Sequence, residues 1–413
     1  MRKLEIPDTQ NTVIAFRHLS DFQLRKASWL FAALGHPTLS QAGQKAVLAA
    51  LRLRLPVEWM IKNTVFSQFC GGETIHDCKA RIEELWRYKV GAILDYAAEG
   101  LQHERDFEQV CAEVQRTIRL AADHPAIPFC VFKVTGVARL ALLEKVSSGA
   151  TLQGAEHGEW QRCCDRVARL CALAAKKGVR LFIDAEESWI QSAIDELVYP
   201  MMSQFNRERV IVYNTLQMYR KDRLEHLQLA IAKARDQGYK LGFKLVRGAY
   251  LEKEGLRAAK LSYPNPLFRE KKDTDSAYDR ALELCIRHVE MVSLVAGTHN
   301  EYSTLHLVRL MAEEGLAADD DRVHFSQLLG MSDHLSFNLA DAGFNVAKYV
   351  PYGQVQTLIP YLVRRAQENS AMRGQMSREL LLLQREQARR SGRPGAAAVG
   401  FSMQDDGKMP SKK

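Results

Sequence analysis

The 413-residue sequence lacks a long hydrophobic run, a secretory leader and any CxxC motif. No stretch approaches the roughly 20 apolar residues that a membrane-spanning helix needs. The first ten residues, MRKLEIPDTQ, contain early acidic residues and no apolar core, which argues against a secretory signal and a mitochondrial presequence. These absences predict a protein of the cytoplasm, either free there or attached peripherally to the inner membrane.

The eight cysteines do not form a zinc ribbon or a redox dithiol motif, because none is spaced as CxxC. Several lie among apolar residues, which is typical of small core residues in a reducing compartment. The net charge of +8, from 57 basic and 49 acidic residues, is spread along the chain. No nucleic-acid partner is therefore expected.

Familiar catalytic motifs are also missing. The chain has no HExxH, GxSxG or P-loop motif, and no acidic cluster with the spacing of a hard-metal site, so no metal is expected. No nucleophile stands out. These features suit a reaction in which a bound cofactor performs the difficult step.

From about residue 90 onward, eight short β-rich runs alternate with amphipathic stretches. The runs are VGAILDYA, FCVFKVTG, RLFIDAE, RVIVYNTLQ, KLGFKLVRGAY, VSLVAGTHN, RVHFSQLLG and NVAKYVPYG. This alternation predicts a (β/α)8 barrel in the α/β class. An open doubly wound sheet is the alternative, but its usual G-x-G-x-x-G motif is absent. The predicted divisions are a helical region over 1–88, a barrel over 89–390 and a disordered tail over 391–413.

Polar residues gather at the carboxyl ends of the predicted strands, where barrels of this kind hold their active sites. They are Lys133, Asp184, Gln217, Arg247, Tyr250, His299, Asn300, Gln327 and Tyr349. Asp184 could instead cap the helix that begins near Ser188, and His299 and Asn300 could cap the helix after them. Lys133 and Lys244 lie inside apolar runs, where a buried ammonium needs a partner. Asp184 is the natural counter-ion for one of them.

The segment IPYLVRRAQEN, residues 359–369, predicts a helix with Pro360 in its first turn. One face of this helix carries Tyr361, Arg364, Arg365 and Glu368. The stripe fits a solvated face with an Arg364–Glu368 pair, and equally a clamp for a carboxylate or phosphate.

Three segments, FKLVRGAYLEKE, GTHN and KYVPYGQVQTLIPYLVRRAQEN, closely resemble the signature sequences of the proline dehydrogenase family. FCVFKVTG, LFIDAEESW and VYNTLQMYRKD are similar too, and the resemblance runs from about residue 90 to about 372. It implies the monofunctional form, with a distorted (β/α)8 barrel, non-covalent FAD and a final helix over the barrel mouth. The implied reaction converts L-proline to Δ1-pyrroline-5-carboxylate and passes the electrons to a membrane quinone.

The resemblance also implies roles for individual residues. Arg364 and Arg365 would bind the proline carboxylate, and Glu368 would hold an arginine in place. Lys133 would lie beside substrate and flavin, ordered by Asp184, and Lys244 would lie near the reactive flavin nitrogen. The implied pocket walls are Tyr250, Leu328, Tyr349 and Tyr361, and the implied cofactor-lining residues are Ala185, Gln217, Lys244, Arg247, Gly248, Ala249, Thr298 and His299.

Other functions stay open at this point. A hydroxyproline dehydrogenase is one, although the family position of Tyr349 is a tyrosine in enzymes that use proline. A barrel lyase with Lys133 or Lys244 as a Schiff-base amine is another, and a non-catalytic basic binding protein is a third.

Residues 27–62 further predict peripheral attachment to an anionic membrane. The only acid there is Glu58, the basic residues are Lys45, Arg52, Arg54 and Lys62, and the apolar surface would come from Trp29, Phe31, Leu48, Leu51, Leu55 and Trp59. The alternative is that these helices simply pack on the barrel.

Overall fold

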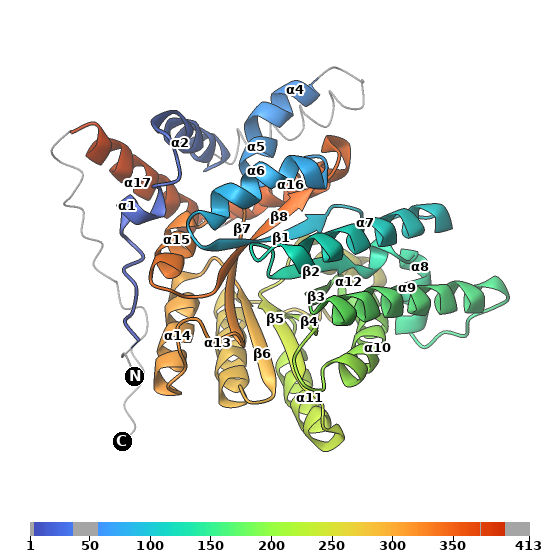
Figure 1. The fold of residues 1–413 in the computed structure, drawn as a ribbon. Coiled ribbons are helices and arrows are strands. Elements are labelled where there is room, and N and C mark those ends of the chain that lie inside the picture. The colour runs from blue at the N-terminus through green and yellow to red at the C-terminus, as the bar shows by residue number, and fades with distance from the viewer. Residues whose placement is uncertain (1–3, 36–56, 372, 393–413) are drawn as a thin grey trace.

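The computed structural model describes residues 4–35, 57–371 and 373–392, and within 366–377 the backbone alone. Eight parallel strands pair in chain order, and β8 pairs with β1 to close a barrel (Figure 1). The strands are β1 Val90–Tyr96, β2 Phe129–Lys133, β3 Arg180–Asp184, β4 Val212–Gln217, β5 Leu241–Val246, β6 Val292–Gly297, β7 Val323–Leu328 and β8 Val346–Tyr352. Each predicted β-rich run contains one strand, so the predicted barrel is confirmed.

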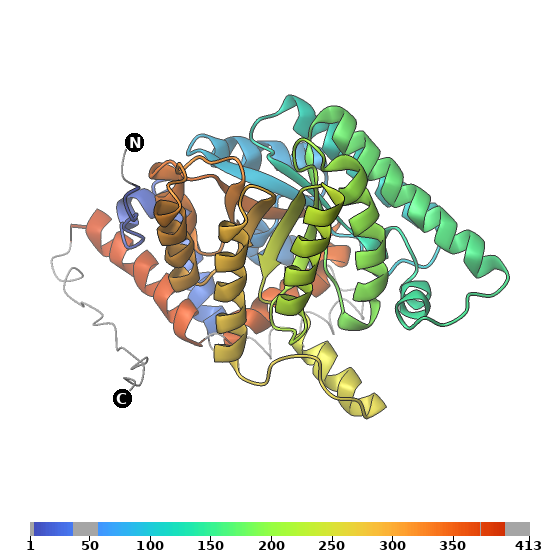
Figure 2. The same ribbon diagram turned by 90° about the horizontal axis from the view of Figure 1, so that it is seen from below.

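Helices surround the barrel, as the view from below shows (Figure 2). Those between the strands are α7 Glu104–Asp123, η2 Val134–Gly136, α8 Leu140–Ser147, α9 Ala155–Lys177, α10 Ser188–Phe205, α11 Arg223–Gln237, α12 Leu251–Leu261, α13 Lys271–Arg287, α14 Glu301–Glu313 and α15 Asp333–Asp341. Helices α9 and α11 end at Gly178 and Gly238 in the left-handed conformation. Glycine adopts that conformation without steric cost, so it is well suited to these two helix ends.

The remaining helices come from the two ends of the described chain. They are α1 Thr12–Ala15, α2 Asp21–Gly35, α4 Glu58–Ile61, η1 Lys62–Phe66, α5 Ser67–Phe69, α6 Ile75–Trp86, α16 Val355–Ala371 and α17 Arg373–Arg390. Helix α2 contacts both α16 and α17, and Figure 1 shows these helices on one side of the barrel. Residues 36–56 of the predicted helical region lie outside the described residues, as does the predicted tail from residue 393 onward.

Three apolar cores hold these elements. The largest lies between the strands and the surrounding helices, and a second joins α2 to α16 and α17 through residues such as Phe31, Leu358 and Leu383. The third fills the barrel itself. There the rings of Phe129 and Phe182 stack with centroids 4.5 Å apart, and Tyr213 meets both edge-on. Alternate strand residues point inward, so this aromatic layer plugs the barrel below its mouth.

The prediction that Pro360 lies in the first helical turn was wrong. Helix α16 begins at Val355, so Pro360 lies inside it. Val355 and Leu358 are fully buried in the core that α16 shares with α2. Burial of these two side chains favours the extra turn, even though proline leaves one backbone carbonyl without its helical partner.

Candidate active site

Asp184 at the end of β3 joins two residues from other strands at the barrel mouth. Its Oδ1 accepts a hydrogen bond from Lys244 Nζ on β5, and its Oδ2 accepts one from Tyr349 OH on β8 at 2.5 Å. The Lys244 ammonium also lies 4.8 Å from the ring centroid of Tyr349 and 5.1 Å from that of Phe182. All three polar residues are buried, so the triad is a desolvated cluster of one anion, one cation and one phenol.

The electrostatics of the triad keep Asp184 ionised. Burial alone would raise the pKa of this carboxyl, but Lys244, Lys133 and the two hydrogen bonds outweigh it and hold the pKa below its usual value. The pKa of the Tyr349 phenol is raised well above 10, first by burial and then by the Asp184 charge. Tyr349 therefore remains a hydrogen-bond donor to Asp184.

Lys133 has other partners than the expected one. Its ammonium lies 2.9 Å from Glu99 Oε1 and 3.4 Å from Asp95 Oδ2, whereas the Asp184 carboxylate pairs with Lys244. The two acids lie at and beyond the end of β1, so Asp184 is not the direct partner of Lys133 and acts on it only through its charge. Burial disfavours the charged ammonium, but Asp95 and Glu99 raise the pKa of Lys133 well above its usual value.

Helix α16 crosses the barrel mouth. Its Arg364 donates to Glu99 beyond β1 at 3.0 Å, and the guanidinium carbon lies 6.0 Å from the ring centroid of Tyr250 beyond β5. Strands one and five lie opposite each other in an eight-stranded barrel, so one side chain reaches both only from above the mouth. Helix α16 is therefore not an outer helix of the ring.

Arg365 lies beside Arg364 and is 6% exposed, with its guanidinium 5.0 Å from the Tyr361 ring. A solvated face does not bury an arginine in this way, so the structure contradicts that interpretation of the stripe. The side chain of Glu368 lies outside the part of the chain that the structure describes.

Gln217 and Arg247 organise the opposite side of the mouth. The Gln217 amide donates to the Glu186 carbonyl at 2.6 Å and accepts from the Ala249 N–H at 3.3 Å. Arg247 donates to Asp275, Thr298 and Ser303 at 2.7, 2.7 and 2.9 Å. These bonds fix the turn after β5 against β4 and β6.

Gly248 lies in that same turn with φ of +136°, where a Cβ would come within 2.5 Å of the Tyr219 ring. The turn therefore requires glycine at this position.

The remaining predicted residues lie around the same rim. His299 Nδ1 is 2.9 Å from Ser332 Oγ, and burial lowers the pKa of this imidazole to about 3. Asn300 caps α14 by accepting from Ser303 N, as the structural alternative held. Ala185 follows β3, and Leu328 ends β7 in contact with the cores on both sides.

Comparison with known proteins identifies the family of the chain. The family model described as proline dehydrogenase matches residues 78–378. The chain belongs to the proline dehydrogenase family. This confirms the resemblance noted in the sequence and assigns the chain to a family of oxidoreductases that act on proline.

Named relatives of this proline dehydrogenase family member have several activities. The chain is 33% identical to proline dehydrogenase 1, mitochondrial, of Dictyostelium discoideum, over 82% of this chain and 67% of the relative. It is 34% identical to the carbapenem antibiotics biosynthesis protein CarD of Pectobacterium carotovorum subsp. carotovorum, over 79% and 84%. It is 30% identical to hydroxyproline dehydrogenase of Xenopus laevis, over 91% and 88%.

Among solved structures, proline utilization A of Bdellovibrio bacteriovorus inactivated by N-propargylglycine matches with a TM-score of 0.68 at 19% identity. The match covers 79% of this chain and 35% of that one, so the chain spans about a third of the larger protein. At this identity the match supports the fold of this proline dehydrogenase family member.

Three residues of the site were missed by sequence reasoning. Asp95 carried a usable signal, because it is a lone acid inside an apolar strand, as Lys133 is a lone base. Glu99 lies in a polar loop and has no such signal. Glu186 is fully buried, accepts from Thr135 N at 3.0 Å and from the Thr135 hydroxyl, and has its pKa raised by burial to about 8.

The donor set on the β4–β6 side suits a flavin in a proline dehydrogenase. It combines an ammonium at Lys244, a guanidinium at Arg247, a hydroxyl at Thr298 and an amide at Gln217. Lys244, Thr298 and Gln217 are buried at the mouth, and hydrogen bonds to Asp184, Arg247 and Glu186 fix their positions. A flat, polar-edged and anionic molecule is the ligand that such donors match.

Proposed function

We propose that the chain is an FAD-dependent proline dehydrogenase that oxidises L-proline to Δ1-pyrroline-5-carboxylate. The observation that carries this proposal is the position of α16, which holds Arg364 against Glu99, a partner of Lys133, and keeps Arg365 buried beside it. Two guanidiniums over a mouth lined by Tyr349 and Tyr250 suit a small amino acid whose carboxylate points toward the helix.

The protein's contribution to the reaction is placement. Arg364 and Arg365 would fix the substrate carboxylate, and the tyrosine rings would fix the pyrrolidine ring. FAD would supply the hydride acceptor for the ring carbon next to nitrogen. The residues that would hold it are Gln217, Lys244, Arg247, Gly248, Ala249, Thr298 and His299, with Ala185 nearby. That nitrogen must be unprotonated so that its lone pair stabilises the positive charge left behind. The Lys244 ammonium would stabilise the negative charge of the reduced flavin.

Hydroxyproline is the second candidate substrate, since one relative carries that name. Tyr349 argues for proline. Its phenol is held at the mouth by the 2.5 Å hydrogen bond to Asp184, so it cannot readily move aside for a hydroxylated ring. The Schiff-base alternative needs a neutral amine, and the raised pKa of Lys133 and the Asp184 partner of Lys244 oppose one.

The electrons would pass to a membrane quinone, with peripheral attachment through α2 and α4. Trp29 and Trp59 are 66% and 75% exposed on these helices. Phe31 is not available, because it is buried against the core shared with α16, and that part of the prediction was wrong. Leu48, Leu51 and Leu55, with Lys45, Arg52 and Arg54, lie outside the described residues. No described helix is long and apolar enough to cross a bilayer.

The decisive experiment is reduction of a redox dye by L-proline with the purified protein, together with its absorption spectrum. We expect a flavin spectrum near one equivalent and proline-dependent dye reduction. A colourless protein that folds normally would reject the proposal.

Flotation with anionic liposomes tests the membrane contact. Absence of binding at low salt by the full chain would reject that contact.

A further inference from the structure

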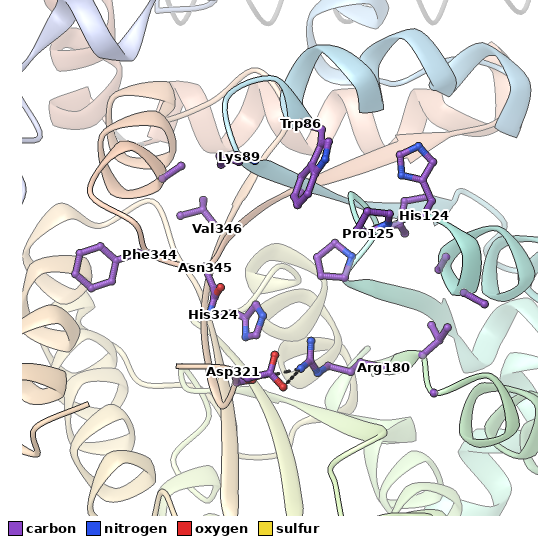
Figure 3. Close-up of a pocket in the computed structure, with 18 of the residues that line it drawn as sticks. Trp86, Lys89, His124, Pro125, Arg180, Asp321, His324, Phe344, Asn345 and Val346 are labelled. Carbon is purple, nitrogen blue, oxygen red and sulfur yellow. Dashed lines mark hydrogen bonds and ion pairs between the residues drawn. The ribbon is translucent and has the colours of Figure 1, made fainter. Parts of the chain in front are cut away.

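A second cavity opens at the opposite end of the barrel, where the strands begin. It has a volume of about 530 Å³ and is lined from the starts of β1, β3, β7 and β8 and from the segment before β2 (Figure 3). The aromatic layer of Phe129, Phe182 and Tyr213 fills the barrel between this cavity and the mouth. The cavity is therefore separate from the proposed proline site.

The most informative lining residue is His324 on β7. It is 5% exposed, and its ring meets Phe129 edge-on at 4.8 Å. Burial, followed by the nearby Arg180 charge, lowers the pKa of His324 to about 3, so the imidazole is neutral. A neutral imidazole has one N–H donor and one acceptor nitrogen.

Neither ring nitrogen of His324 hydrogen-bonds to any residue in the described ranges, and Figure 3 shows the ring directed into the cavity. Neither nitrogen is among the enclosed polar atoms that lack a partner, so both can bond to water or to a ligand that enters the cavity. Asn345 beside it does not fill the role, because its amide donates to the carbonyls of Asp320 and Val323 at 2.9 and 3.3 Å.

The lining is cationic. Among the described lining residues there is one acid, Asp321, which pairs with Arg180. The basic lining residues are Lys89, Lys177, Arg180 and Arg209. The Asp321 side chain is 80% exposed, so its charge is largely screened by solvent. Three cations are left over at the rim.

Apolar surface lies beside this charge. Trp86, Ile127, Pro128 and Val346 line the same cavity. The Lys89 ammonium lies 5.5 Å from the Trp86 ring, and Lys89 has a positive φ of 61°, which is uncommon for a residue other than glycine. The unusual backbone holds this lysine at the rim over the tryptophan.

We propose that this cavity binds a small organic anion with a flat apolar body. The anionic group would meet Lys89, Lys177 and Arg209 at the rim. The flat body would lie along Trp86 and the apolar wall, and its inner edge would complete the hydrogen bonding of His324. A bare inorganic anion would leave the apolar wall and His324 without contacts, so it fits less well.

The test uses the full-length, FAD-loaded protein and 2-naphthalenesulfonate as the probe, with affinity measured by calorimetry at low salt. We expect one equivalent to bind, and the uncharged analogue 2-naphthol to bind at least tenfold more weakly. Lys89→Glu/Lys177→Glu should weaken binding of the sulfonate at least tenfold. These side chains are exposed, so the fold does not depend on them. His324→Phe keeps a flat ring of similar size but removes both ring nitrogens, so it should also weaken binding.

Two control variants separate this site from others. Lys233→Glu reverses an exposed charge on α11 that does not line the cavity, and it should bind like the wild type. Arg365→Met alters the barrel mouth and should also bind like the wild type. Absence of binding by the wild type, or a loss in Arg365→Met with none in Lys89→Glu/Lys177→Glu, would overturn the proposal.

Discussion

Arg364 on α16 and Glu99 beyond β1 form an ion pair, with Nη2 and Oε1 3.0 Å apart. The same oxygen is 2.9 Å from the ammonium of Lys133 on β2. Burial alone would raise the pKa of Glu99, but Lys133 and Arg364 lower it to about 2, so the carboxylate stays charged. One acid thus ties the helix over the mouth to the strand below it.

Glu99→Gln should raise KM for proline about tenfold, or about 1.4 kcal/mol. The amide keeps the shape of the side chain but loses its charge, so Arg364 is held less firmly where the carboxylate binds. Steady-state kinetics check this, with little change expected in kcat. Glu159→Gln is the matched control, because Glu159 lies on α9 and pairs with Arg139 instead of with Lys133 or Arg364. Equal KM values in both variants would mean that Glu99 does not position Arg364.

Arg365→Met should raise KM roughly 30- to 900-fold while the flavin stays bound. The substrate carboxylate would lose a charge-assisted partner in a desolvated site, which costs about 2–4 kcal/mol. Kinetics and the flavin spectrum of the same sample give the result. Arg207→Met removes an exposed arginine that donates to the carbonyls of Gln237 and Gly238 and to the Ser203 hydroxyl, and it should behave like the wild type. A KM within twofold of wild type would remove Arg365 from the substrate site.

The pair of Asp184 and Lys244 should act as one unit in turnover. Asp184→Asn leaves the buried ammonium without its counter-charge, and Lys244→Met leaves the carboxylate without its cation, so each should lower kcat at least tenfold. The double variant should lose much less than the product of the two losses, with a coupling of about 1–3 kcal/mol. A cycle of Asp184→Asn with Lys133→Met serves as the comparison and should show weaker coupling. If the kcat losses of Asp184→Asn and Lys244→Met multiply fully in the double variant, the two residues do not act as one unit.

The barrel could be predicted from the sequence because each strand reads as a short β-rich run ended by polar residues. The buried lysines were also readable, since charge inside an apolar run is unusual. Asp184 was predicted as the counter-ion of one of them and pairs with Lys244, but the partners of Lys133 were not predicted. Lys133 and Asp184 occupy neighbouring strands in register, yet Lys133 pairs with Glu99 from a loop. Such pairing depends on loop conformation, which local periodicity does not report.

The position of α16 could be inferred only through family resemblance. Its pattern of Tyr361, Arg364 and Arg365 fits a solvated face as well as a clamp, and only tertiary contact with α2 and with Glu99 decides between them. The start of α16 was also predicted wrongly, because it too depends on tertiary contacts. Burial of Val355 and Leu358 overrides the local preference of proline for a first turn.

Glu186→Gln should raise stability at alkaline pH. The pKa of Glu186 is about 8 in the folded protein, above its unfolded value of about 4.5, because the carboxyl is buried. Between these values the unfolded chain releases this proton and the folded chain keeps it. The contribution of this group therefore falls as pH rises from about 4.5 to 8 and is constant outside that window, with a limiting slope of about 1.4 kcal/mol per pH unit.

Gln keeps the shape and can still accept from Thr135, so the variant should show a flatter stability profile across that window. Denaturant unfolding at pH 5, 6.5 and 8 measures it. Asp165→Asn, which neutralises an exposed acid on α9, is the control and should keep the wild-type profile. Parallel profiles for wild type and Glu186→Gln would show that Glu186 titrates normally.

Tyr349 should set the preference for proline over trans-4-hydroxy-L-proline. Its phenol is buried and is held by Asp184 Oδ2 at 2.5 Å, with Lys244 4.8 Å from its ring. A ring fixed on two sides cannot move away for an added hydroxyl, and overpacking costs about 1–3 kcal/mol. The wild type should therefore favour proline roughly 10- to 200-fold in kcat/KM. Tyr349→Ser should narrow the gap, chiefly by weakening proline oxidation.

Tyr349→Phe separates the ring from its hydroxyl. The ring still fills the space, so discrimination should remain near that of the wild type, while loss of the bond to Asp184 should lower kcat for both substrates. The measurement is kcat/KM for both amino acids in all three proteins. If Tyr349→Phe loses the preference for proline as fully as Tyr349→Ser does, the selectivity depends on the hydrogen bond and not on the volume of the ring. If the wild type prefers the hydroxylated substrate, the assignment to proline is wrong.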